Sequence, residues 1–464
     1  MVFLGRTRRV HFVGIGGIGM SGIAEVLLNL GFDVSGSDLK GSELTERLKA
    51  MGAAIWAGHD GAHIAGADVV VYSSAVTPDN PELVEARRQG IPTIPRGEML
   101  AELMRLKYAV TVAGAHGKTS TTSLIASVLA QGGLDPTVIV GGKVRALSSN
   151  ARLGGSRYVV AEADESDGQF VNLPSSVAVI TNIDLEHLDF YADLAAIEAA
   201  FVEYANRVPF YGAVILCADD ARTMAISSRI ARRKVTYSLG GAADLCGRVL
   251  ERGPGWTRFS VQDGHGVLGE VTLHIPGDHY ARNALAAVAA GRWLDIPFEQ
   301  IQLGLEQWQG VGRRFEVKGE VGGVLVIDDY GHHPTEIAAT IQAALASYRR
   351  RLFVMFQPHR FSRTQSVADQ FARCFDGAHR VFVTDIYAAG EKPIPGVSAL
   401  TIVDRVRAHG KVAVEHVRSL EELLDRAGAE LREGDMVITM GAGDIYRAGE
   451  KLLARLATAA QSKG

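Results

Sequence analysis

Cysteine is scarce in this 464-residue sequence, which holds only Cys217, Cys246 and Cys374, far apart from one another. That spacing forms neither a disulfide framework nor a zinc-binding pattern, and it is typical of a protein in a reducing cytosol. Uninterrupted apolar runs long enough to span a membrane are missing, as are the ordered basic, apolar and cleavage regions of a signal peptide. We therefore expect a cytoplasmic protein that does not associate with a membrane.

A strong excess of charge of either sign is also missing. The chain has 48 Lys and Arg residues against 52 Asp and Glu residues, a formal net charge of −4. Because this balance is close to neutral, it offers no electrostatic basis for binding nucleic acid. The length exceeds what one hydrophobic core normally supports, so we expect two to four domains.

Glycine, by contrast, is abundant at 52 residues, and its most informative use lies in the stretch VTVAGAHGKTSTTSL, residues 110–124. The β-branched start predicts a buried strand, Gly114 and Gly117 bracket a tight turn, and Lys118 and Thr119 open a helix. Backbone N–H groups at a helix N-terminus bind phosphate, a lysine there reaches the terminal phosphates, and a threonine hydroxyl binds Mg²⁺. The stretch predicts a loop that binds terminal phosphates and Mg²⁺. The first glycine of the usual pattern is absent, so a glycine turn in an ordinary strand–helix unit is the alternative.

A second glycine loop, GIGGIGMSG, follows a predicted strand near the N-terminus. Gly14, Gly16 and Gly19 match the G-x-G-x-x-G pattern, and Asp38 follows about 20 residues later. This arrangement predicts a diphosphate at a helix N-terminus and an acid near a ribose hydroxyl. The pattern is typical of NAD binding, but the same geometry serves a nucleotide sugar, so the sequence pattern leaves both open.

Strands and helices alternate along nearly the whole chain, which predicts an α/β fold of three domains. We expect a Rossmann-like domain at 1–106, a central P-loop ATPase-type α/β domain at 107–312, and a Rossmann-like domain at 313–464. Short alternating segments at 237–274 predict a small antiparallel patch in the central domain. Ligands bind beyond the carboxyl ends of such strands. His59 and Ser74 follow strands of the first domain, so each is a candidate ligand contact, although each also suits an ordinary polar turn.

Acidic residues crowd after two predicted strands of the central domain. EADESDGQF begins with Glu162, and NIDLEHLDFY contains His187. Carboxylates this close repel one another unless a cation lies among them, and carboxylates are ligands that Mg²⁺ prefers. These segments predict a magnesium site, with solvated acidic turns as the alternative.

Polar residues also follow strands in the C-terminal domain. Tyr330 and His332 lie in DDYGHHPTE, and His359, Arg360 and Arg363 lie in QPHRFSRTQ. Guanidinium groups bind carboxylates through paired hydrogen bonds. The arginine pair therefore predicts a clamp for a substrate carboxylate.

Taken together, GIGGIGMSGIAEVL, AGAHGKTSTT, AEADESD, TNIDLEHLD, ARNALAA, GRRFE, DDYGHHPTE and QPHRFSRT resemble, in this order, the Mur ligase family and its alanine-adding branch. The resemblance implies domains for a UDP-sugar, ATP and an amino acid, so it favours UDP over NAD at the first loop. It also implies a bacterial cytoplasmic enzyme of peptidoglycan precursor synthesis. We expect it to join L-alanine to the lactyl carboxyl of UDP-N-acetylmuramate through an acyl phosphate, with ATP and two Mg²⁺ ions.

The resemblance also implies roles for individual residues. The UDP-sugar would contact Gly14, Gly16, Gly17, Gly19, Met20, Asp38, His59 and Ser74. ATP would contact Gly114, Ala115, His116, Gly117, Lys118, Thr119, Ser120, His279, Asn283 and Arg314. The metal ions would be held by Thr119, Glu162 and His187. The amino acid would lie against Tyr330, His332, His359, Arg360 and Arg363. The catalytic set would be Lys118, Glu162, His187, Tyr330, His332, Arg360 and Arg363.

Three other functions stay open at this point. A related ligase would attach a whole peptide to the same sugar. A nicotinamide-dependent oxidoreductase would explain the first loop but not Lys118 or the acidic segments. A nucleotide-sensing protein without activity is disfavoured because no expected functional position is lost. The sequence leaves open whether the protein is a monomer or a homodimer.

Overall fold

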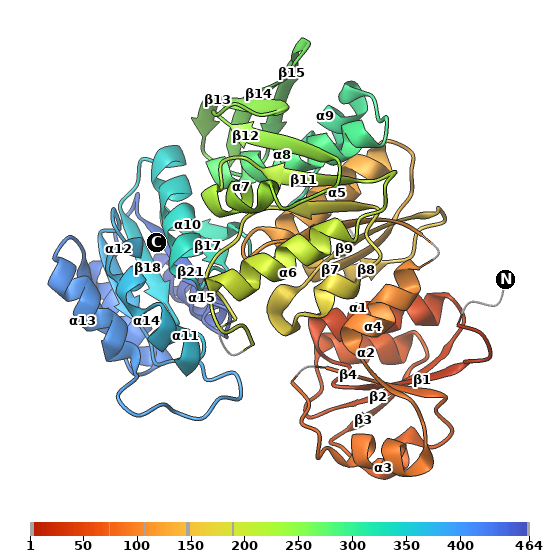
Figure 1. Ribbon diagram of the computed structural model, residues 1–464. Coiled ribbons are helices and arrows are strands. Elements are labelled where there is room, and N and C mark those ends of the chain that lie inside the picture. The colour runs from red at the N-terminus through yellow and green to blue at the C-terminus, as the bar shows by residue number, and fades with distance from the viewer. Residues whose placement is uncertain (1–3, 74, 106, 145–148, 188–189, 462–464) are drawn as a thin grey trace. The chain divides into compact units, whose positions relative to one another are not determined.

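The computed structural model describes residues 4–73, 75–105, 107–144, 149–187 and 190–461. They form three β-sheets of five, ten and six strands, with helices in many of the connections between strands (Figure 1). This architecture confirms the predicted α/β fold class. By its internal contacts the chain divides into two compact units: Met1–Arg248 with Ser260–Val271 and Arg282–Val311, and Val249–Phe259 with Thr272–Ala281 and Gly312–Gly464.

The N-terminal sheet is parallel, with the strand order β3-β2-β1-β4-β5. Its strands are β1 (Arg9–Val13), β2 (Asp33–Asp38), β3 (Ala54–Ala57), β4 (Val69–Tyr72) and β5 (Thr93–Pro95). Its helices are α1 (Ile18–Asn29), α2 (Glu43–Ala50), α3 (Pro81–Gln89) and α4 (Arg96–Met104). The chain leaves β1 for β2 on one side, and β4 lies on the other. The first glycine loop follows β1, so it lies where the strand order reverses and where such folds bind ligands.

The central sheet has the order β15-β14-β13-β12-β11-β10-β6-β9-β7-β8. Its strands are β6 (Tyr108–Ala113), β7 (Thr137–Val144), β8 (Ser149–Arg152), β9 (Tyr158–Glu162), β10 (Val177–Ile180), β11 (Ala213–Cys217), β12 (Lys234–Leu239), β13 (Leu245–Gly253), β14 (Trp256–Asp263) and β15 (Gly266–Leu273). The helices in this part of the chain are α5 (Lys118–Gln131), α6 (Leu194–Asn206), α7 (Ala221–Ser227), α8 (Asp278–Trp293) and α9 (Phe298–Glu306).

Strand β6 lies between β9 and β10 and is parallel to both. Because parallel strands end at the same edge, the acidic segments after β9 and β10 flank the phosphate loop that follows β6. The strand β6 is buried from Ala109 to Ala113, which fixes the start of this loop. The sheet is mixed, since β7 and β8 pair antiparallel. The expected short strands at 237–274 are present, although β13 joins β12 in parallel.

The C-terminal sheet has the order β16-β17-β21-β18-β19-β20, with β16 antiparallel to β17 and the other neighbouring strands parallel. Its strands are β16 (Glu316–Val321), β17 (Val324–Asp329), β18 (Leu352–Phe356), β19 (Arg380–Val383), β20 (Ala413–His416) and β21 (Met436–Met440). Its helices are α10 (Pro334–Ser347), α11 (Phe361–Ser366), α12 (Phe371–Cys374), α13 (Ala399–His409), α14 (Leu420–Glu430) and α15 (Tyr446–Gln461). Strands β17, β18 and β21 are completely buried, so their polar ends are fixed by a rigid core.

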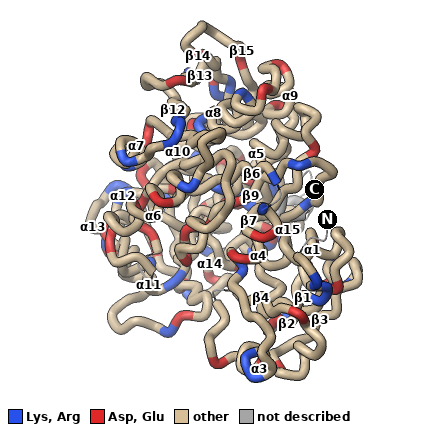
Figure 2. Tube along the Cα trace, turned by 45° about the vertical axis from the view of Figure 1, so that its right-hand side comes forward, with Lys and Arg blue, Asp and Glu red and all other residues tan. Residues whose placement is uncertain are grey.

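Lys and Arg residues are interspersed with Asp and Glu residues along the chain (Figure 2). Among the described residues, no helix has both the length and the apolar character that a membrane span requires.

Candidate functional site

The phosphate loop connects the buried strand β6 to α5, whose first residue is Lys118. Gly114 has a φ of +135°, and a Cβ added there would collide with the Thr181 hydroxyl oxygen. A side chain at this position is therefore excluded both by conformation and by space. Gly117 begins the helix from the left-handed region, and the side chain of Asn283 lies against it, with Oδ1 3.0 Å from the position of a Cβ. Asn283 thus lies beside the loop, and its contact with ATP stays a prediction.

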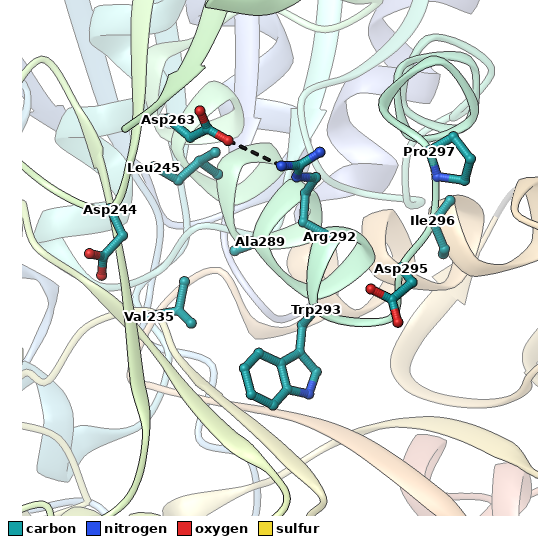
Figure 3. Close-up of a pocket in the computed structure, with 10 residues that line it drawn as sticks. All are labelled: Val235, Asp244, Leu245, Asp263, Ala289, Arg292, Trp293, Asp295, Ile296 and Pro297. Carbon is teal, nitrogen blue, oxygen red and sulfur yellow. Dashed lines mark hydrogen bonds and ion pairs between the residues drawn. The ribbon is translucent and has the colours of Figure 1, made fainter. Parts of the chain in front are cut away.

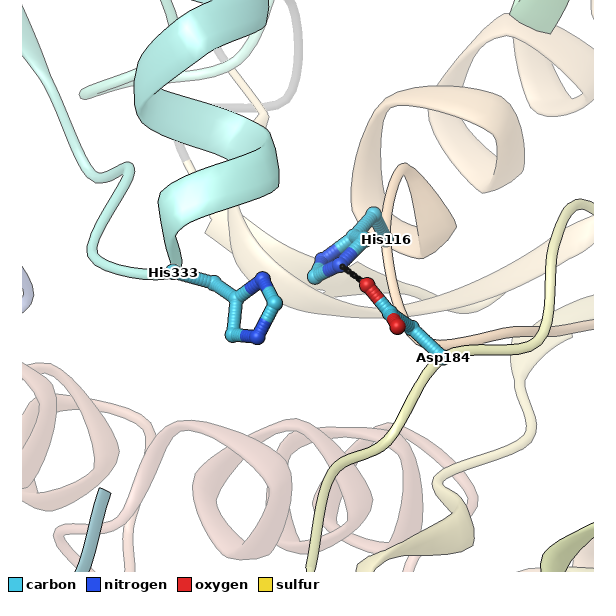
Figure 4. A group of neighbouring side chains, drawn as sticks. All are labelled: His116, Asp184 and His333. Carbon is cyan, nitrogen blue, oxygen red and sulfur yellow. Dashed lines mark hydrogen bonds and ion pairs between the residues drawn. The ribbon is translucent and has the colours of Figure 1, made fainter. Parts of the chain in front are cut away.

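The segment after β10 holds this loop in place through His116. The backbone N–H of His116 donates to Asn182 Oδ1 at 2.8 Å, and its carbonyl accepts from Thr181 Oγ1 at 2.7 Å and from Asn182 Nδ2 at 2.9 Å. The ring Nε2 lies 3.2 Å from Asp184 Oδ2 (Figure 4). Asp184 is paired in turn with Arg222 at 2.6 Å. His116 therefore fixes the loop, and its backbone is already hydrogen-bonded to the protein.

Lys118 Nζ is bonded to both carboxylate oxygens of Glu165, at 2.7 and 2.9 Å, and to the Gly114 carbonyl at 2.7 Å. Burial alone would lower the pKa of Lys118, but the charges of Glu165 and Asp164 outweigh burial and hold this pKa above its ordinary value. The lysine is therefore charged, as a phosphate-binding cation must be.

Glu162 lies at the end of β9, beside the loop. Its Oε1 accepts the backbone N–H of Gly141 at 2.7 Å, and its carboxylate is hydrogen-bonded by the Thr119 hydroxyl. Burial raises the pKa of Glu162 above its ordinary value. A bound cation would favour the charged form of such a carboxylate, so the predicted pair of Thr119 and Glu162 has the donor chemistry of a magnesium site.

A second group of ligand atoms forms around His187. One side-chain atom each from Glu165, Glu186 and His187 lies within 4.8 Å of the others. Burial would lower the pKa of His187, but Glu165 and Glu186 raise it above its ordinary value. The Tyr191 hydroxyl donates to the carbonyl of Glu165 at 2.8 Å and so fixes that residue. The sequence pattern identified His187 but did not single out either carboxylate as its partner.

At the first glycine loop, the Gly16 backbone N–H donates to Asp38 Oδ2 at 2.8 Å. A Cβ on Gly16 would lie 2.8 Å from the same oxygen and 3.2 Å from the Thr45 methyl group, so the carboxylate itself requires glycine here. Asp38 therefore fixes the conformation of the loop through this hydrogen bond, whereas its contact with a ribose stays a prediction. His59 Nδ1 lies 2.9 Å from Ser37 Oγ.

The remaining residues expected around the UDP-sugar fall into two groups. Gly14, Gly17, Gly19 and Met20 lie in this loop or in the first turn of α1, whereas Ser74 lies outside the described residues.

Arg96, the first residue of α4, was not identified from the sequence. A Cβ on Gly19 would lie 2.7 Å from Arg96 Nη1, so the guanidinium packs on the start of α1. Arg96 Nη2 also pairs with Asp164 Oδ2 at 3.0 Å. The structure thus places the Arg96 guanidinium against the predicted diphosphate loop. Its acidic partner, Asp164, lies 68 residues away in the sequence.

The second unit brings together four of the five residues expected around the amino acid. Ring centroids are 5.5 Å apart for Tyr330 and His332, and 5.6 Å apart for His332 and His359. Arg363 Nη1 lies 3.4 Å from His359 Nδ1. Burial and the Arg363 charge lower the pKa of His332 well below its ordinary value, and they lower the pKa of His359 to about 4. The imidazoles are thus neutral near pH 7, and Arg363 supplies positive charge for a carboxylate.

Arg360 differs from the expected clamp. Its Nε donates to Glu391 Oε1 at 2.5 Å, and Glu391 also accepts from the Ser362 hydroxyl at 2.6 Å. Arg360 has a φ of +72°, in the left-handed region that a non-glycine residue adopts only when its surroundings hold it there. Glu391 therefore fixes the arginine at the start of α11. The pattern of two arginines did not indicate this partner.

The other residues expected near ATP, His279 and Arg314, belong to the second unit. The ring of His279 is 4.2 Å from that of Tyr280. Arg314 lies over the Tyr330 ring and 3.7 Å from Glu336.

A separate cavity of about 480 Å³ lies in the central part of the chain (Figure 3). Its ten lining residues are Val235, Asp244, Leu245, Asp263, Ala289, Arg292, Trp293, Asp295, Ile296 and Pro297. None of these is a predicted site residue. Val235 lies near the amino end of β12, whereas ligands of parallel sheets bind at the carboxyl ends.

Comparison with known proteins identifies the family of this chain. Residues 9–108 match the family model described as "Mur ligase family, catalytic domain", residues 112–291 match "Mur ligase middle domain", and residues 313–443 match "Mur ligase, glutamate ligase domain". The chain is 54% identical over 454 residues to the UDP-N-acetylmuramate–L-alanine ligase of Solibacter usitatus, covering 98% of this chain and 96% of that protein. The chain belongs to the Mur ligase family. Among other Mur ligases, the enzyme of the same name from Geobacter sulfurreducens is 51% identical over 99% of this chain and 100% of its own length.

Solved Mur ligase structures show the same fold. The UDP-N-acetylmuramate–alanine ligase of Thermotoga maritima has a TM-score of 0.82 and 30% identity, covering 97% of this chain and 99% of that one. A murein peptide ligase from Psychrobacter arcticus has a TM-score of 0.71 at 22% identity, covering 97% and 99%, and shows likeness of fold alone. Membership of this family removes the nicotinamide interpretation of the first loop.

Proposed function

We propose that this chain joins L-alanine to the lactyl carboxyl group of UDP-N-acetylmuramate, with cleavage of ATP to ADP and phosphate. The observation that carries the proposal is the phosphate loop with Lys118 between two acidic strand ends, in a chain whose full-length relatives bear this activity in their names. A carboxylate is a poor acylating agent. Transfer of the γ-phosphoryl group to a carboxylate oxygen would form an acyl phosphate and release ADP.

In this proposal the loop would hold the ATP phosphates. Backbone N–H groups at the start of α5 would cradle them, and Lys118 would exchange contacts with Glu165 for contacts with the terminal phosphates. Asn283 lies beside Gly117 and would contact the nucleotide. Both reactants are anions at this step, so the chain's work is to position them and to neutralise charge.

The residues present fit magnesium. Thr119 and Glu162 would hold one ion, and His187 with Glu165 and Glu186 would hold a second. When bound, Mg²⁺ would neutralise the phosphate oxygens and the developing charge of the phosphoryl group.

The C-terminal residues would bind the amino acid. Arg363 would pair with the alanine carboxylate, while neutral His332 and His359 and the ring of Tyr330 would line the same pocket. The alanine nitrogen would then attack the acyl carbon, and the tetrahedral intermediate would expel inorganic phosphate as the amide forms. Glu391 would hold Arg360 in position.

Release of phosphate from ATP tests the proposal directly. We expect release only when ATP, UDP-N-acetylmuramate and L-alanine are all present, with one new amide per phosphate. The reaction should be repeated with glycine, with L-serine, and with the peptide L-alanyl-γ-D-glutamyl-meso-diaminopimelate. Faster turnover of the peptide than of alanine would assign the chain to the peptide-adding type instead. Release without the sugar would contradict the ligase assignment.

A further inference from the structure

The carboxylate of Glu82 is completely buried inside the N-terminal domain. Glu82 lies in the first turn of α3, where its backbone N–H donates to the side chain of Asn80 at 3.0 Å. A buried carboxylate is costly unless hydrogen bonds satisfy it. The proposed mechanism makes no use of this group, so its partners are informative.

Four side chains surround the Glu82 carboxylate, and the ring Nε2 of His11 lies 3.7 Å from Oε1. Ser37 Oγ donates to Oε2 at 2.5 Å, His59 Nδ1 lies 3.1 Å from the same oxygen, and His63 Nδ1 lies 2.8 Å from Oε1. Burial alone would raise the pKa of Glu82, but hydrogen bonds from His11, Ser37 and His63 lower it to about 2. The carboxylate is therefore charged near neutral pH and can only accept hydrogen bonds.

This arrangement fixes the proton of His59. Both neighbours of the His59 Nδ1 atom are acceptors. The Ser37 hydroxyl donates its hydrogen to Glu82, so its oxygen, 2.9 Å from Nδ1, can only accept a hydrogen bond from His59. The Nδ1 atom must carry the hydrogen. In a neutral ring the remaining nitrogen, Nε2, is then unprotonated and acts as an acceptor.

His59 is the member of the cluster that follows a strand end. It comes two residues after β3, at the carboxyl edge of the parallel sheet, and its side chain is 16% exposed. His11 is fully buried, and the ring of His63 is stacked on Trp56 with centroids 4.8 Å apart. The side chain of His63 is equally exposed at 16%, so the feature that distinguishes His59 is its position directly after the carboxyl end of β3.

We propose that Glu82 is a positioning residue that holds His59 as a hydrogen-bond acceptor for a ring N–H of the substrate's base. The N3–H of uracil is such a donor, whereas cytosine presents an acceptor at N3. Glu82 would thereby favour uracil over cytosine without touching the substrate. The inference rests on the proposed placement of His59 at the uridine end of the sugar nucleotide.

Titration of the full-length protein with UDP and with CDP tests this role. Glu82→Gln supplies an N–H donor where the carboxylate accepted, so His59 should move its proton to Nε2. In the variant the Nε2–H of His59 and the N3–H of uracil would both be donors, so one hydrogen bond would be lost. We therefore expect the affinity for UDP to fall roughly 10- to 100-fold and the affinity for CDP to change much less. His63→Gln removes another partner of the same carboxylate and should leave the UDP-to-CDP ratio within about twofold.

Two further measurements separate positioning from a purely structural role. In a His59→Ala background, Glu82→Gln should no longer change the UDP-to-CDP ratio, since the residue acts through His59. Nitrogen-15 NMR of the imidazole should show His59 protonated at Nδ1 in the wild type, a result that does not depend on whether the variant folds. Protonation at Nε2 in the wild type would overturn the proposal.

The design also separates this inference from the site assignment on which it rests. If His59→Ala leaves UDP affinity unchanged, the uridine end lies elsewhere. If His59→Ala weakens UDP binding while Glu82→Gln leaves the UDP-to-CDP ratio unchanged, the site stands and the role of Glu82 is refuted.

Discussion

Lys118 and Glu165 form a two-pronged ion pair, with the lysine nitrogen 2.7 and 2.9 Å from the two carboxylate oxygens. The phosphate-loop cation is thus neutralised by the protein itself. Glu165 also belongs to the group around His187 that would hold a metal ion. With a metal ion bound there, the same carboxylate would have two cationic partners, so we expect nucleotide and metal binding to be linked through it.

Glu165→Gln should tighten the binding of metal-free ADP and weaken the response to Mg²⁺. The variant removes the charge that competes with phosphate for Lys118, so we expect about a five- to tenfold lower Kd for ADP in EDTA. The concentration of Mg²⁺ needed for half-maximal ligation should rise. Calorimetric titration with and without Mg²⁺ measures both effects. Glu203→Gln, at an exposed pair with Arg207, serves as the control. An ADP affinity equal to that of the wild type would refute the link.

Lys118→Ala should abolish ligation while leaving the affinity for UDP within about twofold. The lysine belongs to the phosphate loop, whereas the proposed sugar-nucleotide residues belong to a different sheet. Phosphate release and UDP titration measure the two properties separately. Lys49→Ala, on the exposed surface of α2, should change neither. An equal loss of UDP affinity would show that the assignment of ATP and the sugar nucleotide to two separate sites is wrong.

Gly16→Val should raise KM for UDP-N-acetylmuramate at least about tenfold and leave KM for ATP and L-alanine within a few-fold. The added side chain would collide with Asp38 and Thr45 and break the bond that holds the loop N–H. Steady-state kinetics in each substrate would test this. Gly41→Ala is a matched control because no atom lies within 4 Å of the added Cβ. An unchanged sugar KM in the valine variant would argue against a diphosphate at this loop.

Stability should fall as pH is lowered from about 6.5 to 4, partly because of His359. Burial and the neighbouring arginines lower the folded-state pKa of His359 to about 4, whereas an unfolded chain's histidine takes up its proton near 6.5. The unfolded state therefore binds more protons across this range, and His359→Gln should recover about 1 to 3 kcal/mol at its acidic end. Melting temperatures measured against pH test this, with the exposed His274→Gln as control. If the melting temperatures of His359→Gln and the wild type fall equally with decreasing pH, the effect is ruled out.

The two glycine loops were predictable because their geometry is local. At each loop a short run of residues specifies strand, turn and helix start, and the structure places β1, α1, β6 and α5 accordingly. The resemblance to the Mur ligases is likewise confirmed, since its motifs span nearly the whole chain.

What the sequence did not indicate are the partners of these residues. Glu165 lies 47 residues from Lys118, Arg96 lies 68 residues from Asp164, and Glu391 lies 31 residues from Arg360. Lys118 and Glu165 meet because β6 and β9 are neighbours in the sheet although β7 and β8 lie between them in the chain. Arg96 and Asp164 follow strands of two different sheets, and Arg360 and Glu391 lie in the long segments that follow the neighbouring strands β18 and β19. Residue spacing carries no information about such neighbours. The roles of the individual site residues, and the domain bounds, stay predictions.

The position of β6 between β9 and β10 has a consequence for synthesis on the ribosome. The phosphate loop emerges early, yet the contacts that hold His116 come from residues 181–184, and those that neutralise Lys118 come from residue 165. A nascent chain in which β10 has not yet emerged therefore exposes the loop without the contacts that hold His116. The contacts that hold the phosphate loop should therefore be complete only after residues to about 187 have left the exit tunnel, and a stalled shorter chain should not be stabilised by ATP.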